Sequence, residues 1–167
     1  MFTKKSVYAV LDNPAIRSQI NNQVLDLLAT IASNRREDFS GAGLLFYGDL
    51  SKLPHLQMSL GPGGLPKSQI RGYDIASIVT SLSRTLTPLH DGFHFIDVQS
   101  WKITHISQFI SPPIPHDAAS KFNGAGARFM SAALASILPG IVCVGLVSRQ
   151  GKIHLLCNGT DVCNEIE

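Results

Sequence analysis

Charged residues are scarce in this sequence: they make up 16% of its 167 residues, against about 25% in average globular proteins. With a hydrophobic content of 44%, the composition excludes a disordered chain, and we expect a partner to cover part of the apolar surface. The net charge is only +2, and the basic residues are dispersed apart from the pair Arg35-Arg36. This distribution argues against a nucleic-acid partner, which needs a concentrated basic surface, and leaves small phosphorylated ligands open.

Long hydrophobic runs are also missing. The longest, residues 137–147, is interrupted by Pro139 and Gly140 and falls short of the roughly 20 residues that a membrane helix needs. The apolar segment near the amino terminus, residues 7–11, is too short for the core of a signal peptide. We therefore expect a cytoplasmic protein with no membrane partner, and a chain of this length predicts a single domain over residues 1–167.

Several catalytic and metal-binding motifs are absent. The three cysteines, Cys143, Cys157 and Cys163, lack the paired spacing of a zinc site, which favours buried or incidental thiols. No Gly-x-Ser-x-Gly sequence occurs and no cysteine has an identifiable histidine base, which argues against covalent hydrolysis. The cluster Gly61-Pro62-Gly63-Gly64 neither directly follows a strand nor opens a helix with a lysine, so it is interpreted as a plain loop.

Apolar periodicity predicts the order of the elements. Spacings of three and four residues predict a helix from a cap at Asp12-Asn13-Pro14 to Ile31, a second over 75–86 capped by Asp74, and a third over 123–138. Short apolar runs predict strands at 44–47, 93–98, 101–110, 141–147 and 153–157. Residues 51–73, rich in glycine and proline, are expected to form a long loop. The order predicts an α/β or α+β fold, with a sheet flanked by helices.

Two segments contain candidate functional residues. Asp91 and Gly92 lie between the second helix and an apolar strand, where a carboxylate has no evident folding role and is typical of a metal or nucleotide site. His90 and His94 flank them and are either additional metal ligands or ordinary exposed or hydrogen-bonded histidines.

The second segment is Asn123-Gly124-Ala125-Gly126-Ala127-Arg128, at the start of the third helix. Glycines allow a ligand to approach the backbone, and free N–H groups at a helix start attract anions. Arg128 adds a group that can bind phosphate through two hydrogen bonds. The alternative is that the glycines only shape the turn and that Arg128 is a surface charge.

Together these segments resemble the diadenylate cyclase domain, also called DisA_N, over most of residues 20 to 160. The resemblance rests on Tyr47-Gly48-Asp49, residues 86–98, Ala132-Ala133-Leu134, and residues 142–148 with 153–159. In that family a central mixed β-sheet flanked by helices binds ATP, and two domains meet face to face to join two ATP molecules into cyclic di-AMP. The resemblance therefore implies a nucleotide partner, a homo-oligomer, and Mn²⁺ or Mg²⁺ as the cofactor of an active enzyme.

The family motifs are only partly retained. The first, Asp-Gly-Ala, reads Asp91-Gly92-Phe93, and its aspartate serves the metal and the attacking 3′ hydroxyl in the family. The second, Gly-Thr-Arg-His-Arg, reads Gly126-Ala127-Arg128-Phe129-Met130, and the third, a serine followed by glutamates, reads Ser148-Arg149-Gln150. The departures thus fall on the positions that carry the chemistry.

The resemblance implies a set of site residues. Asp91 is the catalytic and metal-binding residue, with His90 or His94 as a substitute for the missing family histidine. Ile110 matches an aliphatic residue that walls the family's adenine pocket, and Phe93 either fills space in the cleft or stacks on a base. The expected nucleotide-binding residues are Gly92, Phe93, Ile110, Gly126, Ala127, Arg128, Ser131 and Ser148.

Three functions follow as hypotheses. The first is a nucleotide or cyclic-dinucleotide sensor with lost or weak cyclisation, which signals through a separate effector protein. The second is an active, divergent diadenylate cyclase that uses metal-assisted phosphoryl transfer. The third is a scaffold that binds no ligand and dimerises through the former catalytic face.

Overall fold

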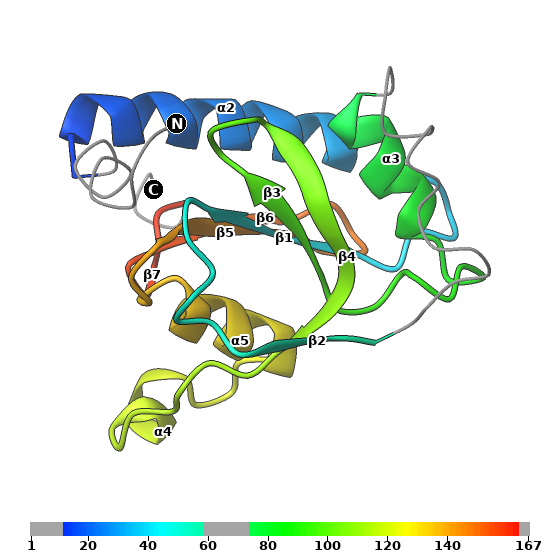
Figure 1. The fold of residues 1–167 in the computed structure, drawn as a ribbon. Helices are drawn as coiled ribbons and strands as arrows, with labels where there is room; N and C mark the ends of the chain where they lie inside the picture. The colour runs from blue at the N-terminus through cyan, green and yellow to red at the C-terminus, as the bar shows by residue number, and fades with distance from the viewer. Residues whose placement is uncertain (1–11, 59–73, 164–167) are drawn as a thin grey trace.

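The computed structural model describes residues 12–58 and 74–163 (Figure 1). Helix α2 (Pro14–Ser33) begins where predicted: the side chain of Asn13 accepts a hydrogen bond from the N–H of Ala15 at 3.0 Å, and Pro14 occupies a first-turn position that needs no N–H partner. Helix α3 (Ile75–Leu82) is capped by Asp74, whose carboxylate accepts from the N–H of Ala76 at 3.4 Å. Helix α5 spans Ala127–Ala135.

The described strands form one mixed sheet in the order β2-β4-β3-β1-β5-β6-β7. Strand β1 runs parallel to β3, and every other neighbouring pair is antiparallel. The strands are β1 (Ala42–Tyr47), β2 (His55–Gln57), β3 (Phe93–Asp97), β4 (Lys102–Ile110), β5 (Ile141–Val147), β6 (Ile153–Cys157) and β7 (Thr160–Asp161).

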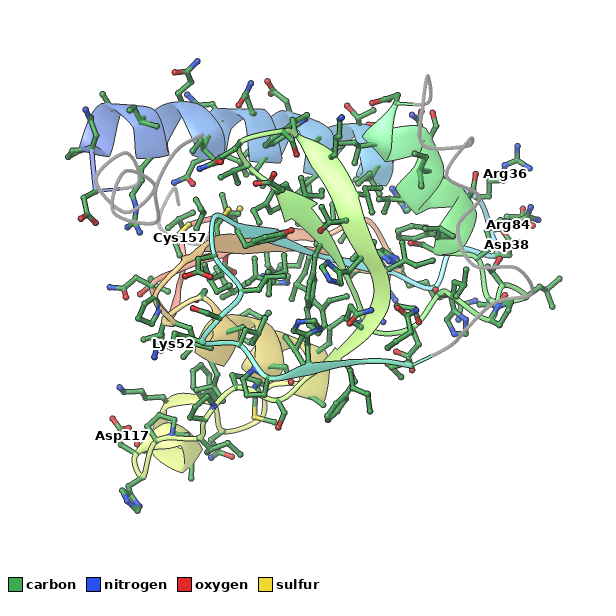
Figure 2. All side chains as sticks on the ribbon, viewed as in Figure 1. Arg36, Asp38, Lys52, Arg84, Asp117 and Cys157 are labelled. Carbon is green, nitrogen blue, oxygen red and sulfur yellow. The ribbon has the colours of Figure 1, made fainter. Side chains whose placement is uncertain are left out.

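Helices cover both faces of this sheet (Figure 1): α2 and α3 lie on one side and α5 on the other. The alternation of side chains along β1 divides the core accordingly. Leu44 and Phe46 pack in the cluster beneath α2, while Leu45 packs in the cluster that includes the alanines of α5. Side chains fill the space between the layers (Figure 2), and the start of β1 and β3 is held beside the start of α5.

The predicted elements are largely confirmed. Strands β5 and β6 match the expected ranges residue for residue, and β3 and β4 match to within one residue. The expected ends of two helices were wrong. Helix α3 ends at Leu82 rather than 86, and Leu86 is 87% exposed. Helix α5 begins at Ala127, not 123, because Gly124 has φ +82°, which an α-helix does not accommodate.

The expected loop over residues 51–73 was wrong in part, since β2 forms within it and pairs antiparallel with β4. Residues 59–73, including the cluster Gly61-Pro62-Gly63-Gly64, lie outside the described residues. The short helix α4 (Ala118–Lys121) and strand β7 were not predicted. Within the described ranges, no helix is both long and apolar enough to span a membrane.

Candidate functional site

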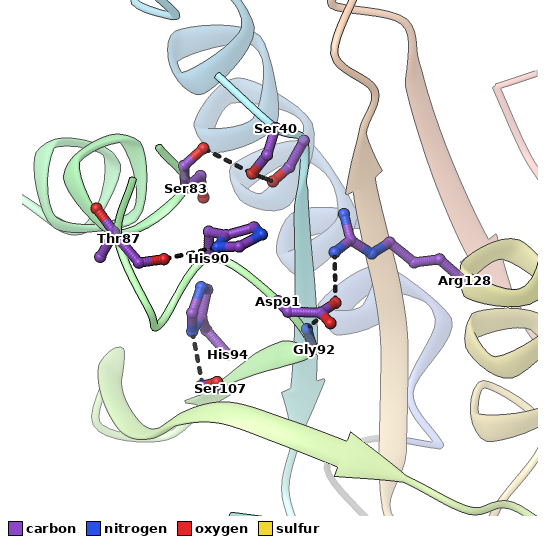
Figure 3. A network of polar contacts seen from close by, with 10 residues as sticks. Ser40, Ser83, Thr87, His90, Asp91, Gly92, His94, Ser107 and Arg128 are labelled. Atoms are coloured by element: carbon purple, nitrogen blue, oxygen red, sulfur yellow. Dashed lines mark hydrogen bonds and ion pairs between the residues drawn. The ribbon is translucent and has the colours of Figure 1, made fainter. Parts of the chain in front are cut away.

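The carboxylate of Asp91 and the guanidinium of Arg128 meet at the start of β3 and of α5 (Figure 3). Nη2 of Arg128 lies 3.3 Å from Oδ1 of Asp91, and the same oxygen accepts the N–H of Gly92 at 2.8 Å. The side chain of Asp91 is 62% exposed and that of Arg128 is 31% exposed. The site is thus an open ion pair that an incoming anion or cation can reach.

Glycine is required next to the carboxylate. Gly92 has φ +78°, and a Cβ there would lie 2.6 Å from the carbonyl oxygen of Gln108. Any other residue would push β3 away from β4 or distort the turn. Gly92 therefore fixes Asp91 at the edge of the sheet.

The start of α5 is suited to binding an anion. Gly126 at the N-cap has an extended backbone, and no side chain caps the helix. The first N–H groups of a helix have no partner within it and carry partial positive charge. Arg128 adds a full positive charge in the same turn, so negative charge is favoured here.

Gly41 lies between Arg128 and the end of β5. A Cβ on Gly41 would lie 3.2 Å from Nη1 of Arg128 and 3.1 Å from the carbonyl oxygen of Val147. The next residue, Ser148, is therefore near Arg128, but its hydroxyl accepts the N–H of Lys152 at 3.0 Å. Ser148 thus stabilises the β5–β6 turn.

A cavity of about 450 Å³ lies between the end of β4, α4 and α5. It brings together three of the expected nucleotide-binding residues, Ile110, Ala127 and Ser131. The residues between β4 and α5, which form the other wall of the cavity, were assigned no role from the sequence. The remaining lining residues are Phe109, Ser111, Pro112, Ile114, Ala118, Ala119, Phe122, Met130 and Leu134.

Phe93 belongs to the core rather than to this cavity. Its side chain is 5% exposed, and a Cβ on Gly43 of β1 would lie 2.8 Å from its ring. The ring fills the space above Gly43, next to the site but covered by protein. It has little free face on which a base could stack.

His94 is buried behind the ion pair. The N–H of Ser107 donates to its Nδ1 at 3.1 Å, and the residue is 1% exposed. Burial, assisted by the charge of Arg128, lowers the pKa of His94 from 6.5 to about 4. His94 is therefore neutral at physiological pH, and its Nδ1 lone pair is engaged.

An irregularity of β4 makes this contact possible. The register between β3 and β4 shifts around Ser107, which has φ +48°. In the described part of the chain the buried hydroxyl of Ser107 has no hydrogen-bond partner. Such bulges concentrate near functional sites, where they redirect a backbone or side-chain group.

The site offers little to a metal ion in the absence of a ligand. Among residues 12–58 and 74–163, no group of three or more histidine, cysteine, aspartate or glutamate side chains is placed to hold a metal. His90 is turned toward the backbone, where its Nδ1 donates to the carbonyl oxygen of Thr87 at 2.6 Å. The carboxylate of Asp91 is the exposed acidic group at the ion pair.

No protein-family model matches the sequence, and a search of curated proteins finds no match. Solved structures do match. A hypothetical membrane-spanning protein from Bacillus cereus superposes with a TM-score of 0.58 at 16% identity, over 83% of this chain, which spans 59% of that protein's length. A cysteine double mutant of DacA from Staphylococcus aureus gives a TM-score of 0.52 at 17% identity, over 89% of this chain and 90% of DacA.

Identities this low establish similarity of fold and nothing about activity. The chain has a central mixed sheet flanked by helices, as expected, and this fold is similar to that of DacA.

Proposed function

We propose that this chain is a nucleotide-binding domain of diadenylate-cyclase type in which cyclisation is lost or weak. The observation that carries the proposal is the exposed pair of Asp91 and Arg128, 3.3 Å apart, at the opening of α5. Ala127, the neighbour of Arg128, lines the apolar cavity. A charged group for phosphates and an apolar space for a base are thus adjacent, which is the usual composition of a ligand site.

The phosphates of the ligand bind to Arg128 and to the free N–H groups at the start of α5. The base occupies the cavity lined by Ile110 and Ser131. In the free protein Arg128 is paired with Asp91, so we expect the guanidinium to turn from the carboxylate to a phosphate when the nucleotide binds. A charge-assisted contact of this kind contributes about 1.5–3 kcal/mol.

A divalent ion fits this site only together with the nucleotide. Mg²⁺ commonly takes one or two carboxylates and completes its shell with phosphate oxygens and water. Asp91 would supply the carboxylate, with His90 the nearer of the two histidine candidates in sequence and not buried. When bound, the ion would neutralise phosphate charge and orient the reacting groups.

Weak cyclisation is expected because few groups contact the phosphates. Of the second motif only Arg128 is basic, since Phe129 and Met130 follow it. Cyclisation requires stabilisation of a transferring phosphoryl group by several charges. The active-cyclase alternative is favoured by the exposure of Asp91, and it would require two copies of the chain.

Incubation with ATP and Mn²⁺, followed by mass spectrometry, distinguishes the sensor from the enzyme. We expect little or no cyclic dinucleotide from the wild-type chain. Efficient formation of product that disappears in the Asp91→Asn variant would establish the active cyclase instead.

A thermal-shift screen distinguishes the sensor from a scaffold. A ligand present at a hundred times its dissociation constant stabilises the folded state by about 2.7 kcal/mol. We expect a shift with ATP or with a cyclic dinucleotide. No shift with ATP, GTP or cyclic dinucleotides would support the scaffold.

The proposal includes a cytoplasmic location and a separate effector protein that responds to the nucleotide-bound state of the chain.

A further inference from the structure

Three arginines surround a hollow at the end of the molecule where α2 stops. The hollow has a volume of about 450 Å³ and lies between the segment after α2 and the β5–β6 turn. Arg36 is labelled at this end of the molecule in Figure 2. The lining residues are Ser33, Arg35, Arg36, Glu37, Arg149 and Gln150.

The charges around this hollow are unbalanced. Among the residues that the structure describes, three arginines line it and only one acidic residue, Glu37. Elsewhere Arg84 pairs with Asp38 at 2.6 Å and Arg128 with Asp91 at 3.3 Å. By contrast, neither Arg36 nor Arg149 forms an ion pair with any residue that the structure describes, and both are exposed. Their positive charge is available to an external anion.

One of the arginines is held in position by the fold. Arg35 donates a hydrogen bond to the carbonyl oxygen of Ala32, at the carboxyl end of α2. Its guanidinium also lies against Gly151 in the β5–β6 turn, where any Cβ would overlap it. The group is therefore held between the end of α2 and the β5–β6 turn before a ligand arrives, which reduces the entropy lost on binding.

The hollow adjoins the candidate site through Gly41. The backbone nitrogen of Arg149 and Nη1 of Arg128 both lie within 4 Å of the position that a Cβ on Gly41 would occupy. Arg128 at the start of α5, Arg149 after β5 and Arg35 after α2 therefore form a row of basic residues that passes the start of β1. At the α5 end of this row, Ala127 lines the apolar cavity.

We propose that the hollow lined by Arg35, Arg36 and Arg149 binds a phosphoanhydride chain. The shared chemistry is a run of linked phosphates, either inorganic polyphosphate or the terminal phosphates of a nucleoside triphosphate. Guanidinium groups suit this ligand because each presents several donors to phosphate oxygens. Binding of a nucleoside triphosphate in the hollow rests on the proposed function, whereas binding of inorganic polyphosphate does not.

Calorimetric titration with sodium tripolyphosphate at low ionic strength tests the site directly. The test variant carries Arg36→Gln and Arg149→Gln, two exposed positions without ion pairs, so folding is preserved. The control carries Arg17→Gln and Lys52→Gln, which also remove two positive charges, at exposed positions that do not line the hollow. We expect the double variant to bind at least tenfold more weakly than wild type, and the control within twofold of it.

Two results would overturn the proposal. One is absence of tripolyphosphate binding to the wild-type chain at low salt. The other is an equal loss of affinity in the control and in the variant with Arg36→Gln and Arg149→Gln, which would reveal general charge attraction rather than a site.

Parallel titrations with ATP and adenosine identify the source of the phosphates. If the double variant loses ATP affinity tenfold and retains adenosine affinity, the terminal phosphates of the nucleotide occupy the hollow. Equal ATP affinity in wild type and double variant would show that the phosphates of ATP do not occupy the hollow, and would leave the proposed function intact. Tripolyphosphate binding by a chain that binds neither ATP nor a cyclic dinucleotide would confirm the hollow and refute the proposed function.

Discussion

The carboxylate of Asp91 lies 3.3 Å from the guanidinium of Arg128, although the two residues belong to different elements. Both side chains are accessible to solvent, and exposed pairs contribute less than about 1 kcal/mol to stability. We therefore predict that Asp91→Asn changes the free energy of unfolding by under about 1 kcal/mol in urea denaturation. A larger loss would mean that the pair is structural and would remove the reason to regard it as a ligand site.

His94 makes stability depend on pH. Its pKa is lowered to about 4 in the folded protein, against about 6.5 in an unfolded chain. Between these values the unfolded chain takes up a proton that the folded protein does not bind. The free energy of unfolding therefore falls as the pH drops from 6.5 to 4, by up to about 3 kcal/mol.

Urea denaturation at pH 7 and at pH 4.5 measures this effect. The His94→Asn variant keeps an acceptor for the N–H of Ser107 but cannot titrate in this range. We predict a smaller loss of stability on acidification in the variant than in wild type. Identical losses would show that other groups control the acid response.

The contact between Gly43 and Phe93 predicts non-additive mutations. Gly43→Ala places a methyl group 2.8 Å from the ring and should cost about 1–3 kcal/mol. Phe93→Ala leaves a cavity and should cost about 3–5 kcal/mol. In the double variant the methyl group enters the vacated space, so the combined loss should be smaller than the sum by at least about 0.5 kcal/mol. Chemical denaturation of the four proteins measures the difference, and simple additivity would contradict the contact.

The thiols of Cys143 and Cys157 should differ in reactivity. Cys143 hydrogen bonds to Cys157 across β5 and β6, which raises the pKa of Cys143 and lowers that of Cys157. Burial raises the pKa of Cys163. Because the thiolate is the reactive form, we predict that iodoacetamide modifies Cys157 first and Cys143 only on unfolding. Peptide mapping by mass spectrometry gives the order, and early modification of Cys143 would contradict the packing.

The sequence predicted those elements whose pattern is local. Strands β5 and β6 were located to the residue because each is a short apolar run bounded by turn residues. Helix α3 was extended too far because Leu86 continues the spacing of three to four, yet it lies on the surface. Strand β2 has three residues, too few to show an alternation of apolar and polar side chains, and it forms because it pairs with β4.

The site was predictable only in part for the same reason. Asp91 and Arg128 come together through the packing of α5 beside the sheet, and the sequence linked them only through a family resemblance. The burial of Phe93 depends on Gly43 in β1, a relation set by the parallel pairing of β1 with β3. The outer wall of the cavity, residues 111–122, has no pattern that distinguishes it from a simple connection.

Calorimetric titration of ATP into wild type, Arg128→Gln and the control Arg17→Gln tests the central claim most directly. We predict that wild type and control bind ATP with similar affinity, and that Arg128→Gln binds at least tenfold more weakly because a charge-assisted phosphate contact is lost. Absence of binding of both ATP and cyclic dinucleotides to wild type, or unchanged ATP affinity in Arg128→Gln, would contradict the account.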